Sequence, residues 1–105
     1  MSANLFMGLR PELRPYADYL YRAAASAGLR PRVTSVFRSS QQQAVLYDRY
    51  RRGMSRLPAA PPGRSMHQLG LAFDMVTDDP AAVGDVWGRM GGRWAGPRDP
   101  VHFEV

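Results

Sequence analysis

The segment SMHQLGLAFD, residues 65–74, holds the features that decide the fold of this chain. From its second half onward, large apolar side chains alternate with smaller or polar ones. This period of two residues is typical of a β-strand and predicts a strand over 70–76 with Asp74 on one face. Gly70 permits a bend at the start of that strand. A rigidly mounted Asp74 can therefore come close to His67, which lies seven residues earlier in the same segment.

Helical and extended patterns alternate on both sides of this strand. Apolar residues at helical spacing, capping serine and aspartate residues and terminal glycines predict helices over 11–27, 40–53 and 80–90. β-Branched or alternating residues predict further strands over 32–37 and 101–105. Three prolines and a glycine predict a surface loop over 54–64. Three helices and three strands in this order indicate an α+β fold.

Length and composition bound the possible classes of protein. The 105 residues predict one domain, spanning residues 1–105. The absence of cysteine excludes disulfides, thiolate catalysis and cysteine-ligated metal sites. No apolar run approaches the ~20 residues of a membrane span, and the first residues lack the pattern of a secretory signal. We therefore expect no membrane span and no signal peptide.

The basic charge of the chain is uneven. All 14 basic residues are arginine; residues 1–64 carry 11 of them against three acids, whereas residues 65–105 carry three against six. A basic half can indicate nucleic-acid binding, but these arginines are scattered and match no nucleic-acid motif. We expect no nucleic-acid partner, and a basic surface would equally suit a polyanionic cell wall.

Each of the two histidines lies near a carboxylate. His67 precedes Asp74 by seven residues, and Asp99 precedes His102 by three. Two imidazoles and one carboxylate are a common ligand set of catalytic zinc, and a further carboxylate such as Asp99 fits the general base that the attacking water needs. Structural and surface histidines show similar spacing, so the residues alone leave both interpretations open.

Three motifs, in order along the chain, resemble those of a known family of zinc peptidases. Residues 65–74 match Ser-x-His-x-x-Gly-x-Ala-x-Asp at every fixed position, and residues 99–104 match an acid, two residues and His-Phe-Glu. Residues 37–47 match Tyr-Arg-Ser-x-x-x-Gln-x-x-Leu-Tyr, with Phe37 in place of the first tyrosine. The family includes D-Ala-D-Ala carboxypeptidases and phage L-alanyl-D-glutamate endolysins, relatives of the hedgehog fold. The resemblance implies a small antiparallel sheet that carries the metal site and about three flanking helices.

The resemblance also implies a role for each matching residue. One zinc ion per chain would be held by His67, Asp74 and His102. Asp99 would be the general base that later passes the proton to the leaving amine. Asp99 is one methylene shorter than glutamate, which the carboxypeptidase-like branch of the family tolerates.

Four more residues are expected around these groups. Arg38 would hold the scissile carbonyl oxygen or a substrate carboxylate, since a fixed planar cation can stabilise a developing oxyanion. Ser65 and Gln43 would line the cleft as polar substrate contacts. Glu104 shares a strand face with His102 and is expected to orient a ligand. Only 24 residues separate Asp74 from Asp99, which predicts a shallow cleft.

The resemblance implies a zinc-dependent peptidase that hydrolyses peptidoglycan stem peptides by attack of a zinc-bound water activated by Asp99. A D-Ala-D-Ala carboxypeptidase and an L-Ala-D-Glu endopeptidase both stay open. The alternative is a non-catalytic zinc-containing module that binds the cell wall, but such a site needs neither Asp99 nor Arg38. We expect a monomer whose partner is a peptidoglycan peptide. With no signal peptide, it would be cytoplasmic or phage-encoded and act at the cell wall after release.

Overall fold

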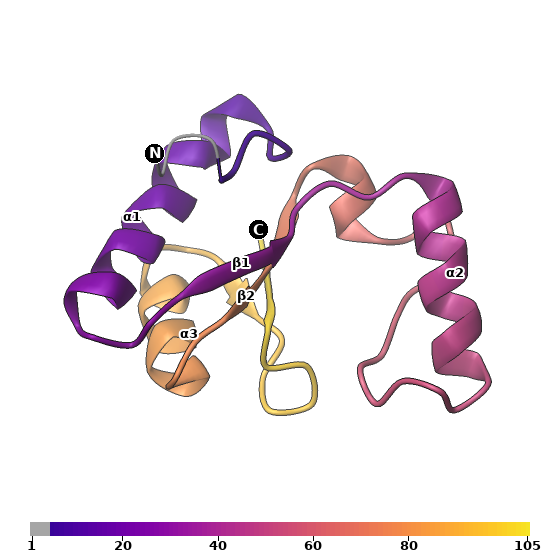
Figure 1. Ribbon diagram of the computed structural model, residues 1–105. Coiled ribbons are helices and arrows are strands. Elements are labelled where there is room, and N and C mark those ends of the chain that lie inside the picture. The colour runs from indigo at the N-terminus through magenta and orange to yellow at the C-terminus, as the bar shows by residue number, and fades with distance from the viewer. Residues whose placement is uncertain (1–4) are drawn as a thin grey trace.

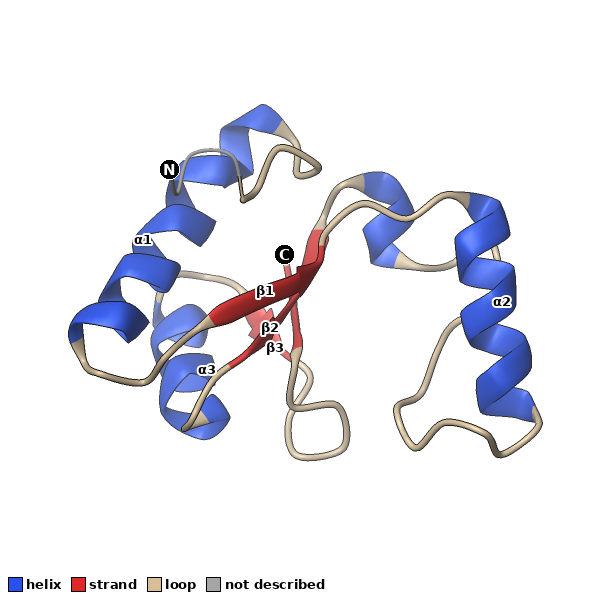
Figure 2. Cartoon of the chain, in the orientation of Figure 1, coloured by secondary structure: helices blue, strands red, loops and turns tan. Residues whose placement is uncertain are grey.

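The computed structural model describes residues 5–105 and confirms the α+β class. Its α-helices are α1 (Arg14–Ser26), α2 (Ser40–Arg51) and α3 (Pro80–Arg89). Its strands are β1 (Arg32–Ser35), β2 (Ala72–Val76), β3 (Arg93–Trp94) and β4 (His102–Glu104). Two short 3-10 helices are η2 (Pro11–Leu13) and η3 (Met66–Leu69). Figure 2 shows the strands meeting at the centre of the molecule, with the helices around them.

The four strands form one antiparallel sheet in the order β1-β2-β4-β3. The strand β2 is central and pairs with β1 on one side and with β4 on the other. In the β2–β4 register, Asp74 lies opposite His102 and Phe73 lies opposite Phe103. Because neighbouring residues of a strand point to opposite faces, one face of β2 and β4 carries aromatic rings and the other carries Asp74 and His102.

The aromatic face of the sheet forms the core with α1 and α3. The rings of Phe73 and Phe103 are stacked, with centroids 5.4 Å apart, and Phe73 meets Phe6 and Trp87 edge-on at 5.1 and 5.4 Å. Such aromatic pairs contribute about 0.5–1.5 kcal/mol each beyond the area that they bury. Figure 1 shows α1 and α3 together on one side of the sheet and α2 on the other. The core therefore fixes β2 from the face opposite Asp74.

The structure differs from the sequence prediction at the ends of strands. β2 begins at Ala72 rather than at residue 70, because Gly70 ends η3 with a left-handed φ of 70°. β1 ends at Ser35, since its register with β2 shifts between Val33 and Ser35. The two-residue strand β3 was not predicted, because so short a segment carries no readable alternation.

The helix α2 and the segment after it stand away from this core. We refer to residues 40–64 as the arm. The helix begins with a capping box in which the Ser39 hydroxyl accepts a hydrogen bond from the backbone of Gln42, and the Gln42 side chain accepts one in return. All of α2 is described, and Gln43 is its one buried residue. Residues 54–64 contain no helix or strand, as predicted.

Two glycines of α3 allow a test of the packing between α3 and β3. A methyl group added at Gly84 would collide with the ring of Trp94, whereas one added at Gly88 would meet no described atom within 4 Å. We expect Gly84→Ala to lower the free energy of unfolding by about 1–3 kcal/mol, the usual cost of overpacking. Gly88→Ala should leave it unchanged or raise it by up to about 1 kcal/mol, because alanine favours the helix. Urea unfolding of both variants checks this, and equal effects would contradict the packing described.

Candidate metal centre

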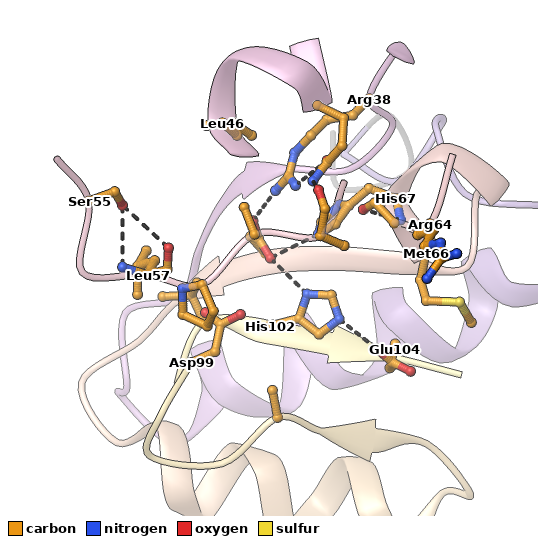
Figure 3. Close-up of a pocket in the computed structure, with 18 of the residues that line it drawn as sticks. Arg38, Leu46, Ser55, Leu57, Arg64, Met66, His67, Asp99, His102 and Glu104 are labelled. Atoms are coloured by element: carbon orange, nitrogen blue, oxygen red, sulfur yellow. Dashed lines mark hydrogen bonds and ion pairs between the residues drawn. The ribbon is translucent and has the colours of Figure 1, made fainter. Parts of the chain in front are cut away.

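Three side chains converge on the polar face of the sheet. His67 comes from η3, Asp74 from β2 and His102 from β4, and one donor atom of each lies within 4.8 Å of the others. The rings of His67 and His102 are 5.1 Å apart between centroids, at an angle of 66°. Figure 3 shows His102 directed towards this point. The structure thus brings together the three residues whose spacing suggested a metal site.

Local hydrogen bonds fix the ring of His67. The hydroxyl of Ser65 accepts a hydrogen bond from the backbone N–H of His67 at 3.2 Å and caps η3. The Nδ1 of His67 lies 2.7 Å from the carbonyl oxygen of Val36, which can only accept, so this nitrogen carries the proton. In the neutral ring the other nitrogen, Nε2, then carries the lone pair that a metal needs, and it lies 3.1 Å from Oδ1 of Asp74. The ring is 1% exposed and has little room to turn.

The ring of His102 is fixed by a carboxylate. Its Nε2 lies 2.7 Å from Oε1 of Glu104, and its Nδ1 lies 3.4 Å from Oδ1 of Asp74. A carboxylate that accepts from one ring nitrogen turns the other nitrogen towards a metal and increases its basicity. Glu104 thus lies where its position on the strand face of His102 predicted an orienting group. Burial favours the neutral ring, but the bonds to Asp74 and Glu104 outweigh it and raise the pKa of His102.

The two oxygens of Asp74 face different partners. Oδ1 faces both histidines, and Oδ2 accepts a hydrogen bond from Nη2 of Arg38 at 2.7 Å. Burial by itself would raise the pKa of Asp74, but its interactions with both histidine rings and with the charge of Arg38 outweigh burial and hold the pKa well below its ordinary value. Two imidazole nitrogens and an ionised carboxylate oxygen, each oriented by a second partner, fit a divalent zinc ion.

Arg38 is held on three sides. Besides its bond to Asp74, its Nε donates to the Ser35 hydroxyl at 3.3 Å and its Nη1 donates to Oε1 of Gln43 at 2.9 Å. Gln43 and Ser65 both line the cleft, as the motifs predicted. Both are also buried, and the hydrogen bonds recorded for them join them to other residues of the protein.

A cleft of about 570 Å³ opens over the three converging side chains. Asp99 lines it from the turn before β4 and is not one of the three clustered donors. Burial is the main cause that raises the pKa of Asp99 above its ordinary value. Figure 3 shows Asp99 and Leu57 on one side of His102 and Arg64 on the other. The cleft is therefore lined by the sheet and by the arm.

Sequence reasoning missed several residues of the cleft wall. It placed 54–64 in a surface loop without a role, whereas residues 55, 57–60 and 64 line the cleft. Arg98, beside Asp99, also lines it. The one available signal was proximity in sequence, because Arg64 directly precedes the motif of residues 65–74 and Arg98 directly precedes that of residues 99–104.

Oriented histidine and carboxylate donors at one point, beside a separate carboxylate in an open cleft, are the features of a metal-dependent hydrolase. The sequence model of the family described as VanY, D-alanyl-D-alanine carboxypeptidase, matches residues 7–89, and the chain belongs to this family. This confirms the resemblance drawn from the motifs. The match includes Arg38, His67 and Asp74 and ends before Asp99 and His102.

Solved structures of peptidoglycan peptidases share the fold. The D,D-pentapeptidase VanY of a VanB-type resistance cassette, an E175A mutant solved in complex with Zn(II), has a TM-score of 0.75 at 23% identity over 92% of this chain and 72% of its own. The LD-carboxypeptidase LdcB gives 0.71 at 25% identity, over 100% and 69%. The L-Ala D-Glu endopeptidase ChiX of Serratia marcescens gives 0.64 at 22% identity, over 99% and 85%. No curated protein matches the chain by sequence.

None of the helices in residues 5–105 is both long enough and apolar enough to cross a membrane.

Proposed function

We propose that this chain is a zinc-dependent peptidase that hydrolyses the stem peptides of peptidoglycan, and that residues 1–105 form its single domain and act as a monomer. The observation that carries the proposal is the convergence of His67 Nε2, Asp74 Oδ1 and His102 Nδ1. The other nitrogen of each ring lies within hydrogen-bond distance of an acceptor oxygen. These three residues would hold one zinc ion per chain. Membership of a D-alanyl-D-alanine carboxypeptidase family and the zinc in the VanY structure support this.

The residues around the cluster supply the remaining chemistry. Zinc, when bound, would act as a Lewis acid that makes water more acidic and polarises the scissile carbonyl. Asp99 takes the proton from the attacking water and returns it to the leaving amine. Its raised pKa brings it nearer to neutral pH than an exposed aspartate, which favours this exchange in both directions. Asp99 is not one of the clustered donors, so its carboxylate remains available to accept the proton of the attacking water.

Arg38 stabilises the negative charge that develops on the scissile carbonyl oxygen. An arginine side chain carries five N–H donors, and three of those of Arg38 are engaged by Ser35, Gln43 and Asp74. The other two are left for a substrate oxygen. Donors that are fixed before the reaction stabilise an oxyanion without reorganisation, and each is worth roughly 10²–10³ in rate.

The rim of the cleft fits an anionic peptide. In the cleft, Asp74 is paired with Arg38 and with both histidines, and Glu104 is paired with His102. None of the ion pairs recorded within residues 5–105 includes the exposed arginines Arg64 and Arg98, which also line the cleft. Stem peptides carry carboxylates, and guanidinium groups bind carboxylates well. A VanY protein has been solved in complex with D-alanine-D-alanine. We propose that the substrate here also ends in a free carboxylate, as in the D-Ala-D-Ala carboxypeptidase type.

Digestion of purified stem peptides tests the function and the bond cleaved. Zinc-loaded protein is incubated with a pentapeptide stem that ends in D-Ala-D-Ala, and the products are identified by mass spectrometry. We expect loss of one terminal alanine. Release of L-alanine from the other end of the stem would instead identify an L-Ala-D-Glu endopeptidase. No product from either bond, together with retention of the protein on cell walls, would favour the non-catalytic wall-binding module.

Removing the carboxylate that orients His102 should weaken zinc binding. We expect Glu104→Ala to lower zinc affinity by roughly 10–100-fold, the usual effect of losing such a partner, and Glu104→Gln to lower it less because an amide oxygen still accepts a hydrogen bond. Competition with a chromogenic chelator measures this. Glu12→Ala, at an exposed position of η2, is the control and should bind zinc like the unmodified chain. Unchanged affinity in Glu104→Ala would show that Glu104 has no orienting role.

A further inference from the structure

The arm is joined to the rest of the molecule through a buried amide. Gln43 is 1% exposed, although every other residue of α2 is at least partly exposed. Figure 1 shows α2 separated from α1 and α3 by the sheet, so the core does not hold this helix in place. A buried polar side chain is costly unless its hydrogen bonds are made. The position of Gln43 therefore depends on its partners.

Both ends of the Gln43 amide are engaged, each by a different part of the molecule. Its Oε1 accepts a hydrogen bond from Nη1 of Arg38 at 2.9 Å, and its Nε2 donates one to the carbonyl oxygen of Ala60 at 2.7 Å. Arg38 in turn donates from Nη2 to Oδ2 of Asp74 at 2.7 Å. A continuous series of hydrogen bonds thus runs from the cleft wall at Ala60, through Gln43 and Arg38, to Asp74.

This arrangement requires a group with one acceptor and one donor. An amide has both, whereas a carboxylate could accept from Arg38 but could not donate to Ala60. The engaged oxygen and the near-complete burial also leave Gln43 poorly placed to bind a substrate. Ala60 belongs to the cleft wall that runs from residue 57 to residue 60, so the same side chain fixes both a cation of the site and the wall opposite the sheet.

We propose that Gln43 is a positioning residue of the peptidase: it sets the orientation of Arg38 and fastens the cleft wall at Ala60, and it does not contact the substrate. The proposal rests on the proposed function and replaces the direct substrate contact expected from the motif. Arg38 acts on the substrate, and the 57–60 wall binds it. The hydrogen bond from Arg38 should therefore affect kcat, and the hydrogen bond to Ala60 should affect KM.

Two substitutions separate these hydrogen bonds. Gln43→Met keeps the size of the side chain and removes both bonds, so we expect kcat to fall by about 10–100-fold, as for a small misplacement of a catalytic group, and KM to rise. Gln43→Glu keeps the acceptor for Arg38 and loses the donor to Ala60, so kcat should stay within about threefold of the unmodified protein while KM rises as in Gln43→Met. Gln41→Met, an exposed glutamine of the same helix, is the control and should change neither constant.

A double substitution tests whether Gln43 acts through Arg38. In an Arg38→Ala background, Gln43→Met should lower kcat by less than about threefold, since the group that it positions is already absent. Multiplicative losses in the double variant would overturn the proposal, because they would indicate an independent contact with the substrate. Kinetic constants of Gln43→Met equal to those of Gln41→Met would overturn it as well.

A measurement without substrate separates this proposal from the proposed function. The Nε–H of Arg38 should give a slowly exchanging NMR signal, assigned by its loss in Arg38→Ala. We expect the signal in the unmodified protein and in Gln43→Glu, and faster exchange with solvent in Gln43→Met. Equal exchange in all three would overturn the positioning role even if the protein is an active peptidase. The expected pattern would support the role even if no stem peptide is cleaved. If Gln43→Met does not fold, Gln43→Glu and the unmodified protein still test the prediction that kcat is kept while KM rises.

Discussion

Replacing Asp99 with asparagine is expected to lower the rate of stem-peptide hydrolysis by roughly 10²–10⁴-fold, the usual worth of a positioned general base. Asparagine keeps the shape and much of the hydrogen bonding of aspartate but cannot take up the proton of the attacking water. Asp99 lines the cleft and lies outside the cluster of donors, so the variant should retain one zinc ion per chain. The loss should therefore appear in kcat and not in zinc content.

Zinc content and hydrolysis are measured side by side for this variant. Asp85→Asn, which changes an exposed aspartate of α3, is the matched control and should retain full activity and full zinc. An Asp99→Asn protein with nearly unchanged activity would show that Asp99 is not the base. A variant that loses its zinc would show instead that Asp99 is a ligand.

Replacing His67 with alanine is expected to abolish stoichiometric zinc binding and, with it, hydrolysis. The ring Nδ1 of His67 is held by the carbonyl oxygen of Val36, and the backbone N–H of His67 donates to the Ser65 hydroxyl, so Nε2 is oriented before zinc binds. Apart from His102, the sequence has no other histidine and no cysteine that could replace it. Zinc held by His67, Asp74 and His102 would join η3, β2 and β4, so its loss should also remove the stability that binding contributes, several kcal/mol if binding is tight.

Elemental analysis and thermal unfolding test the His67 prediction. His67→Ala should contain little zinc after dialysis, and addition of zinc should raise the Tm of the unmodified protein but not that of the variant. Circular dichroism of both proteins without metal shows whether the variant still folds. Equal zinc in both folded proteins would remove His67 from the ligand set.

Much of the candidate metal centre could be predicted because it follows from short-range periodicity in the sequence. The alternation of residues 70–76 placed Asp74 on the face opposite the large apolar side chains, and the core confirms that division. Glu104 lies two residues after His102, and a strand turns such a pair to the same side. The 2.7 Å contact between them therefore follows from local periodicity.

The pairing of Asp74 with His102 could not be derived from local pattern. It depends on the register of β2 and β4, which is set when the chain returns through α3 and β3 and buries Phe73 against Phe103. A slip by one residue would move His102 into the core. The register is therefore specified by the packing of aromatic rings, which no single strand reveals.

The links from Arg38 to Asp74 and from Gln43 to Ala60 were also beyond the sequence. They join residues 36 and 17 positions apart and leave no periodic signal. In the sequence, a buried glutamine of a largely polar helix cannot be told from an exposed one. Gln43 is bonded to Ala60, in the segment that follows α2, and this contact is visible only in the structure. For the same reason, the sequence assigned residues 54–64 to the surface although part of this segment lines the cleft.

Titration of activity with zinc tests the central claim most directly. Metal-free protein is mixed with increasing zinc, and the rate of alanine release from a pentapeptide stem is measured at each addition. We predict no hydrolysis without zinc, a rate that rises in proportion to the zinc added, and a plateau at one zinc ion per chain. Full activity in the metal-free protein, or no hydrolysis once one zinc ion per chain is bound, would contradict the assignment of a zinc peptidase built on His67, Asp74 and His102.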